Sequence, residues 1–321
     1  MKHRYLRLLV AGACFVCAAA LCIPAAAAGE PGAPAGATDA KLAFTAAGKE
    51  YTFNTGALRG TLREGGKSKG LLPVLYGDVG IAGSLGIMSP YRLLTADARF
   101  GTAAWDWASQ ARLLPDGAVE VRWSPDAQHP LEMTAVYRWS APNVLDFTAT
   151  VKPQQDLRKF ELFLASYFDG FPASLVYVQD GPQAGGKPAF LEAVKAAAVW
   201  QAFPRDDEAA RIITDGRWKF PPNPVEWKIM PRLAAPLAVR RDSKSGLAAV
   251  VMAPPEDCFA VLTPFGEEGH RSVYLSLFGR DLKAGEIATA RARLVIGRDI
   301  SGEQAIALYR AYAKKEAPAT P

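Results

Sequence analysis

Histidine and cysteine are scarce in this chain of 321 residues. The sequence contains three histidines and four cysteines, and beyond residue 28 only His129, His270 and Cys258 remain. So few side chains exclude a zinc site made from several histidines or thiolates, and a single cysteine cannot form an intramolecular disulfide. Because Cys258 opens an apolar segment, we expect a small buried side chain there and not a nucleophile.

A large excess of one charge is also missing. The chain has 37 basic and 32 acidic residues, which gives a formal net charge of +5. Lys2, Arg4 and Arg7 lie in the first 28 residues, which hold no acidic residue, so the remainder is close to neutral with both signs interspersed. A nucleic-acid-binding protein needs a concentrated basic surface. Nucleic acid is therefore excluded as a partner.

Several sequence motifs of known chemistry or architecture are absent. The chain has no Walker-type phosphate loop and no G-x-G-x-x-G fingerprint. It has no internal repeat with a period of 20–50 residues, which argues against a propeller or a solenoid. Strands do not alternate with long helices, so a doubly wound parallel sheet is not expected.

The first 28 residues have the layout of a secretory signal peptide. A basic stretch precedes an apolar run over 8–23, and four alanines stand just before Gly29. The run is short for a bilayer-spanning helix, which disfavours a retained membrane anchor. We expect cleavage before Gly29 and a periplasmic or secreted protein without a membrane span. Lipoprotein processing at Cys22 is less favoured because Leu21 stands where a small residue is needed.

The remainder predicts an all-β protein. Residues 29–40 are rich in Pro, Gly and Ala and predict a flexible linker, 41–315 a single domain, and 316–321 a disordered tail. Short apolar or alternating segments between turn residues predict a large antiparallel two-sheet sandwich, or supersandwich, with a C-terminal helix and minor helices in loops. The expected strands cover 41–46, 51–63, 118–123, 131–139, 144–151, 160–167, 237–241, 247–253, 259–263, 272–278 and 287–296.

Three helices are predicted. The C-terminal helix begins at Ser301, whose hydroxyl forms a capping box with Gln304 ahead of an apolar stripe. Two shorter helices are expected over 188–198 and 207–213, inside a middle segment, 181–236, that we expect to lie over a sheet as long loops. Such loops on a rigid scaffold are where binding sites are commonly built.

The middle segment combines tryptophan with charged residues. A tryptophan ring can cover the apolar face of a pyranose, while charged side chains bind its hydroxyl groups. The alternative is that the tryptophans only cover the sheet. Adjacent acids at 206–208 could supply oxygen ligands to Ca²⁺, but they fit a helix start better, so we predict no metal or cofactor. The candidate sugar contacts here are Trp200, Arg205, Asp206, Arg217, Trp218 and Trp227.

A second constellation surrounds the strand at 272–278. A histidine beside carboxylates can perform general acid–base chemistry near neutral pH. The candidate catalytic residues are therefore His270, Glu267, Glu268 and Arg280, with Tyr274 as a substrate contact. The alternative for His270 is an ordinary surface histidine. His129, between Gln128 and Pro130, is a weaker candidate.

Two arginines end another predicted strand. Alternation sends Arg240 and Arg241 to opposite faces of their sheet, so at most one of them faces a site. We take Arg241 as the candidate substrate contact. A guanidinium binds a carboxylate through two hydrogen bonds, which suits an acidic sugar.

The last strands carry a family resemblance. Residues 274–286 read YLSLFGRDLKAGE, and an alternating strand follows over 290–296. A short L-x-x-G-E turn before a long final strand resembles the galactose mutarotase-like β-supersandwich proteins, over about 41–296. The resemblance implies a carbohydrate-active superfamily that includes aldose epimerases, polysaccharide lyases and accessory domains of glycoside hydrolases.

The resemblance leaves the reaction open. Epimerases of this superfamily use a histidine acid and a carboxylate base, but the chain lacks their paired histidine motifs, so mutarotation is not expected. Its lyases use tyrosine, histidine and arginine, residue types that Tyr274, His270 and Arg280 supply. We keep two hypotheses, a lyase, hydrolase or epimerase acting on a glycan and a non-catalytic carbohydrate-binding module. A structural envelope protein is the third alternative.

Overall fold

The computed structural model describes residues 41–63, 69–181 and 184–316. The predicted signal peptide, the linker over 29–40 and residues 317–321 of the predicted tail lie outside the described residues. Within the described ranges, neither α-helix combines the length and hydropathy needed to cross a membrane.

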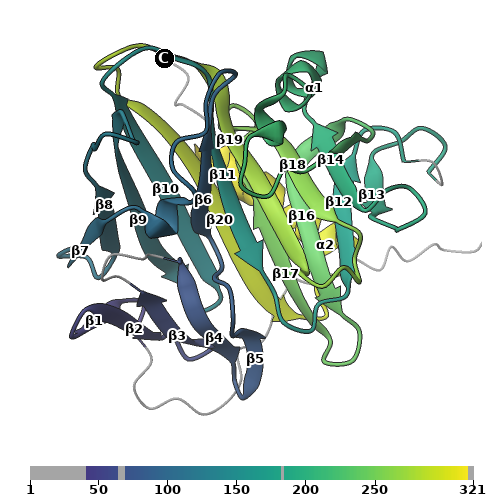
Figure 1. Ribbon diagram of the computed structural model, residues 1–321. Helices are drawn as coiled ribbons and strands as arrows, with labels where there is room; N and C mark the ends of the chain where they lie inside the picture. The colour runs from purple at the N-terminus through teal and green to yellow at the C-terminus, as the bar shows by residue number, and fades with distance from the viewer. Residues whose placement is uncertain (1–40, 64–68, 182–183, 317–321) are drawn as a thin grey trace, which may run out of the picture. The chain divides into compact units, whose positions relative to one another are not determined.

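The described chain forms three sheets (Figure 1). The N-terminal sheet has five antiparallel strands in chain order, and its Phe44 and Phe53 rings pack against Trp139 of the next sheet. Its strands are β1 (Phe44–Ala47), β2 (Glu50–Asn54), β3 (Leu58–Arg63), β4 (Leu71–Tyr76) and β5 (Val79–Ala82).

The largest sheet has nine antiparallel strands. Its long strands alternate buried and partly exposed residues, as in β9, where the positions from Leu131 to Trp139 alternate strictly. In spatial order the strands are β13 (Ala189–Glu192), β12 (Ala173–Val178), β16 (Leu233–Asp242), β17 (Leu247–Met252), β20 (Ala288–Arg298), β10 (Val144–Pro153), β9 (Leu131–Ala141), β8 (Val119–Trp123) and β7 (Ser109–Leu113).

The third sheet has six strands and positions the candidate site. Only the β14–β15 pair is parallel. Its central strands are buried on both faces over most of their length, so buried residues follow one another there instead of alternating with exposed ones. In spatial order they are β15 (Lys228–Ile229), β14 (Trp200–Pro204), β18 (Cys258–Pro264), β19 (Ser272–Leu282), β11 (Leu157–Tyr167) and β6 (Ser89–Leu94).

The two large sheets share one core. Leu162 and Leu164 of β11 and Leu275 of β19 pack in the same cluster as Tyr137 and Phe147 of the nine-stranded sheet. This arrangement confirms the predicted all-β sandwich, to which the N-terminal strands add a separate sheet. Cys258 is fully buried in this core, as predicted, and burial raises the pKa of its thiol to about 12.

Two α-helices and two 3₁₀ turns complete the described chain. Helix α1 (Asp207–Ile213) confirms the prediction for 207–213, and η1 (Ala104–Asp106) and η2 (Arg217–Lys219) are single turns. Helix α2 (Gly302–Glu316) packs Tyr309 and Tyr312 against the nine-stranded sheet.

The prediction of a helix over 188–198 is wrong. Residues 189–192 form β13 instead, because they pair with Leu175–Val178 of β12 at the edge of the nine-stranded sheet. Tertiary pairing overrides the local helical pattern in this segment.

The capping box of α2 gives a stability test. The Gln304 amide N–H donates to Ser301 Oγ at 3.1 Å, and the Ser301 N–H donates to Gln304 Oε1 at 2.7 Å. Ser301→Ala should lower the free energy of unfolding by about 1 kcal/mol, measured by urea denaturation. Arg310→Ala, at an exposed position of the same helix, is the control and should change it by less than about 0.5 kcal/mol. Equal effects of the two variants would contradict a capping role.

Candidate functional site

The six-stranded sheet has a second face, which we call the outer face. Along β11, Phe163, Ala165 and Tyr167 alternate with the core residues and point away from the shared core. Neighbouring strands add Tyr274 of β19 and Leu94 of β6 to the same cluster. The outer face is therefore apolar and rich in aromatic rings.

Residues 205–232, which we call the covering segment, cross the outer face. Ile212 and Ile213 of α1 pack into its apolar cluster, and Figure 1 shows α1 beside β14 and β18. The Trp218 ring lies 4.7 Å from the Phe163 ring, and Trp227 lies 5.4 Å from Trp218. Trp218 is 3% exposed and Trp227 is 8% exposed. Both predicted sugar contacts are therefore buried covers of the sheet, which was the alternative interpretation of the sequence.

A buried ion pair holds the covering segment to the sheet. Arg217 donates to Glu161 Oε2 at 3.1 Å and to the Lys159 carbonyl at 2.9 Å. Asp215 also accepts from this guanidinium, at 2.8 Å from Nη2, and Ser276 donates to Glu161 Oε1 at 2.6 Å. Burial alone would lower the pKa of Arg217, but the charges of Glu161 and Asp215 hold that pKa above its ordinary value. Arg217, predicted as a sugar contact, is thus a structural anchor.

The other charged candidates of the covering segment are also structural. Arg205 donates to Asp206 at 2.8 Å and to the Pro255 carbonyl at 2.9 Å. Asp206 is the N-cap of α1 and accepts from the Ala209 N–H at 2.8 Å. The expectation that the acids at 206–208 begin a helix is confirmed.

One end of the outer face, near the start of β19, carries several polar groups, of which His270 is exposed to solvent. His270 Nδ1 lies 2.9 Å from Glu268 Oε1, and the His270 side chain is 52% exposed. Its ring lies 5.8 Å from the half-buried Trp200 ring and 6.4 Å from the Tyr167 ring. The Tyr274 hydroxyl accepts from Ser272 at 2.7 Å. We call the group Trp200, Tyr167, Glu268, His270 and Tyr274 the polar end.

The two tyrosines of the polar end are hydrogen-bond donors near neutral pH. Burial raises the pKa of Tyr274 to about 12, and burial together with Tyr274 also raises the pKa of Tyr167. Both phenols therefore keep their protons and do not act as bases at neutral pH.

Arg240 fixes the turn that carries Glu268 and His270. Its fully buried guanidinium donates to the Gly266 carbonyl at 2.7 Å and to the Ser272 carbonyl at 3.2 Å, one at each end of the turn. It also donates to the Phe171 carbonyl at 2.7 Å. Burial lowers the pKa of Arg240 to about 9. The prediction that Arg240 and Arg241 lie on opposite faces is confirmed. No sequence pattern indicated that Arg240 supports the turn.

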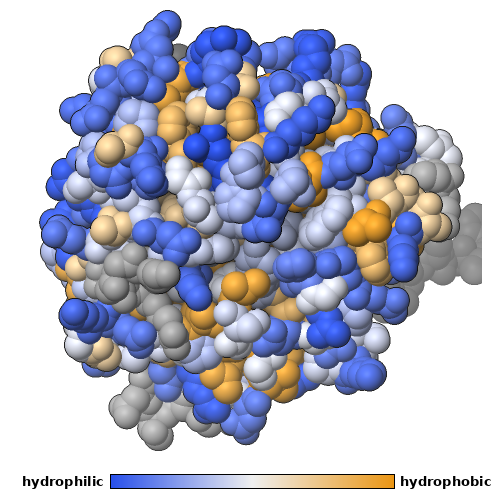
Figure 2. Space-filling model, in the orientation of Figure 1, coloured by the Kyte–Doolittle hydropathy of each residue, from blue (hydrophilic) through white to orange (hydrophobic). Residues whose placement is uncertain are grey.

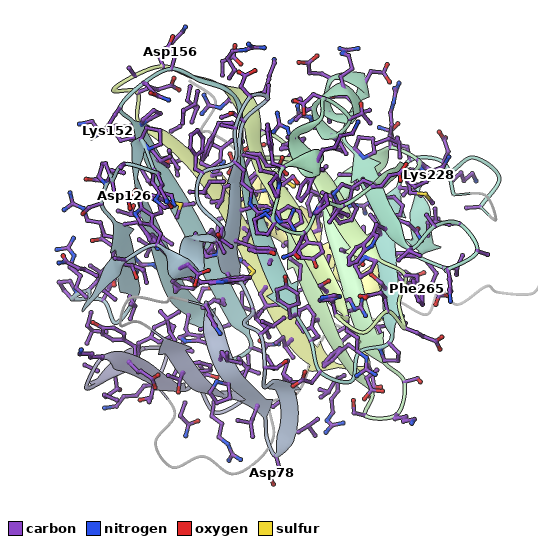
Figure 3. All side chains as sticks on the ribbon, viewed as in Figure 1. Asp78, Asp126, Lys152, Asp156, Lys228 and Phe265 are labelled. Carbon is purple, nitrogen blue, oxygen red and sulfur yellow. The ribbon has the colours of Figure 1, made fainter. Side chains whose placement is uncertain are left out.

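Three predicted site residues lie away from the polar end. Arg241 donates to the Ile300 carbonyl at 2.7 Å and lines a cavity of about 410 Å³ beside α2. Arg280 pairs with Glu286 at 3.0 Å, and it lies eight residues beyond Ser272, roughly 26 Å along the strand. Glu267 lines a separate cavity of about 370 Å³ near Phe265, which is labelled in Figure 3. These residues do not join His270 in one constellation.

His129, the weaker candidate, is buried elsewhere. Its ring stacks on Trp107 at 4.1 Å, and its Nδ1 lies 2.8 Å from Asp126 Oδ1. Among the described residues, no group of three or more His, Cys, Asp or Glu side chains is placed to hold a metal ion.

A second polar and aromatic group, which no sequence pattern indicated, lies at the β6 edge of the outer face. Tyr91 stacks on Trp105 at 4.2 Å with an interplanar angle of 7°, and both rings are half-buried. Arg92 and Arg99 lie beside them, with the Arg92 guanidinium 5.1 Å from the Tyr91 ring. Figure 2 shows apolar and polar surface intermixed on this side of the molecule. These residues carry no sequence motif, because only the fold brings η1 against β6.

Comparisons with known proteins identify the fold. No family model matches the chain, and no curated protein matches it in sequence. The solved α-N-acetylgalactosaminidase of Bifidobacterium bifidum is similar with a TM-score of 0.50 and 12% identity, over 83% of this chain and 39% of that one. The described fold therefore recurs as part of that longer glycosidase.

Other solved structures are also similar. A candidate aldose 1-epimerase from Escherichia coli K12 has a TM-score of 0.44 and 10% identity, over 80% of this chain and 99% of that one. A protein from Synechocystis sp. PCC 6803 has a TM-score of 0.48 and 11% identity, over 75% and 92%. The likeness to the glycosidase is one of fold alone.

The Arg217–Glu161 pair gives a test of how the covering segment is held. Arg217→Met and Glu161→Leu should each lower the free energy of unfolding by about 3–5 kcal/mol, because the first leaves the buried Glu161 without its cation and the second leaves the buried guanidinium with Asp215 alone. The double variant should lower the free energy of unfolding by much less than the sum of the two single variants, since apolar side chains then replace both charges of the pair. Denaturant unfolding of all four proteins measures the coupling.

The matched control is an exposed pair of the same segment. Arg211 donates to Glu208 at 2.7 Å on α1, and Arg211→Ala should cost less than about 1 kcal/mol. Additive losses of unfolding free energy in the Arg217→Met and Glu161→Leu variants would contradict the anchoring role. Losses as small as that of Arg211→Ala would also contradict it.

Proposed function

We propose that this chain is an exported carbohydrate-binding protein whose sugar site is the polar end of the outer face. One observation carries the proposal, the half-buried Trp200 ring 5.8 Å from the ring of the exposed His270, which is itself paired with Glu268. The leader sequence over 1–28 supports the export.

The chemistry of the polar end suits a sugar. A pyranose has an apolar C–H face that packs on an aromatic ring and hydroxyl groups that need directional partners. Trp200 offers the ring, Glu268 an acceptor, and His270 an exposed polar group beside it. Arg240 holds the turn in place, which reduces the ordering cost of binding.

The fold adds a weaker argument. The B. bifidum neighbour is an α-N-acetylgalactosaminidase and the E. coli neighbour a candidate aldose 1-epimerase. A shared fold does not transfer an activity, because function resides in the site. The likeness supports a carbohydrate ligand without naming it.

Catalysis is the second candidate function. A histidine whose Nδ1 is held by a carboxylate is oriented to exchange a proton through Nε2, and Glu268 and His270 have this arrangement. Arg280 and Glu267 take no part in this candidate, because they lie outside the polar end.

Binding is tested on a glycan array with Trp200→Ala. Removing the ring should weaken binding of the tightest glycan by about fivefold or more, because a ring contact of this kind contributes about 1 kcal/mol or more. Tyr177→Ala, at a half-buried aromatic position of the nine-stranded sheet, is the matched control and should bind as the wild type does. Equal losses in the two variants, or no glycan bound by the wild type, would refute the proposal.

Catalysis is tested on the same glycans with His270→Ala. New reducing ends, unsaturated products or changed anomers that vanish in His270→Ala would establish an enzyme. Unchanged glycans with wild-type protein would leave binding as the function.

A further inference from the structure

The β6 edge of the outer face holds two arginines without a counter-charge. Neither Arg92 nor Arg99 forms an ion pair with a carboxylate of the described residues, whereas Arg217 on the same face has both Glu161 and Asp215. Arg92 is 5% exposed and Arg99 is half-buried. Guanidinium groups stay charged near neutral pH, so two positive charges are concentrated in a partly desolvated place.

The neighbouring acceptors are neutral and incomplete. Arg92 donates to the Asn223 carbonyl at 2.9 Å, and Arg99 donates to the carbonyls of Pro222 and Thr102 and to the Tyr91 hydroxyl. The Nε atoms of both arginines are shielded from water and have no acceptor among the described residues. A buried donor without an acceptor is costly.

The two guanidinium groups also repel each other. Burial, and next the positive charge of Arg92, hold the pKa of Arg99 below its ordinary value. Like charges are seldom placed together in a desolvated setting unless an anion joins them. The Tyr91–Trp105 stack beside them, with both rings half-buried, offers an aromatic surface for the apolar part of the same ligand.

We propose that the sugar ligand is acidic and that its oxyanion binds at the β6 edge, against Arg99 with Arg92 behind it and the Tyr91–Trp105 stack alongside. This inference rests on the proposed carbohydrate function and deepens it. From Trp200 on β14 to Tyr91 on β6 the outer face spans four strand spacings, roughly 19 Å. The covering segment lies over the middle of the face, so the β6 edge and the polar end are two separate contact points for one oligosaccharide that carries an acidic unit.

A carboxylate and a sulfate ester share this chemistry, so the test includes both. The probes are trisaccharides of galacturonate, glucuronate, mannuronate and guluronate, each beside its carboxyl-reduced neutral form, together with sulfated and unsulfated galactose trisaccharides. The acidic member of the best pair should bind about tenfold or more tightly than its neutral form, because charge-assisted hydrogen bonds are the stronger ones.

The variants separate charge recognition from folding. Arg99→Gln should bring the acidic-to-neutral affinity ratio close to one while affinity for the neutral form is kept. Arg99→Lys should keep part of the preference, because it retains the charge but not the two-pronged geometry. Arg59→Gln, at an exposed arginine of the N-terminal sheet that pairs with Asp78, should change neither affinity.

A measurement on the unaltered protein completes the test. Raising the salt concentration from about 0.05 to 0.5 M should weaken the binding of the acidic probe and leave the binding of its neutral form unchanged. Equal binding of the acidic and neutral forms, or an Arg99→Gln variant that loses both equally, would overturn the acidic preference and leave the proposed sugar function standing. Failure of every probe to bind would overturn both.

Discussion

The buried ion pair between Arg217 and Glu161 determines what the outer face of the six-stranded sheet can do. Glu161 projects from β11 on the side opposite the shared core, where a charge has no place unless it is paired. Arg217 meets it from the covering segment, and Trp218, the next residue, is set onto Phe163. The middle of an aromatic face thereby becomes a second core.

Covering the middle leaves only the margins of the face available to ligands. Trp200 and His270 remain at one margin, and Tyr91 and Trp105 at the other. Each margin combines aromatic rings with polar groups whose hydrogen bonding is incomplete or solvent-facing. The Arg240 hydrogen bonds and the core beneath β19 hold the turn of the first margin in place, so the proposed sugar would meet a preformed surface.

Much of the fold was predictable because its signals are local. Alternation marked β9 and β10, an apolar run marked β18, and a serine with a glutamine three residues later marked the start of α2. Strand β13 was not predictable, since its partner β12 alone decides between strand and helix. Composition also suggested sugar-binding loops without revealing which tryptophans the fold buries.

The site was predictable only in part, for the same reason. His270 and Glu268 are only two residues apart in sequence, and their pairing follows from that proximity. Arg280 belongs to the same strand as Tyr274, yet strand length carries it away from the polar end. Contacts between Tyr91 and Trp105, or between Arg217 and Glu161, join segments that no local pattern connects.

The most direct test of the account is the NMR signal of the histidine rings in ¹³C-histidine-labelled protein during titration with a glycan bound in the array. His270 and His129 differ in setting, since His270 is exposed at the polar end and His129 is buried against Trp107. The account predicts that saturating glycan shifts the His270 ring signal and leaves that of His129 in place. A glycan that saturates the protein without moving the His270 signal would contradict it.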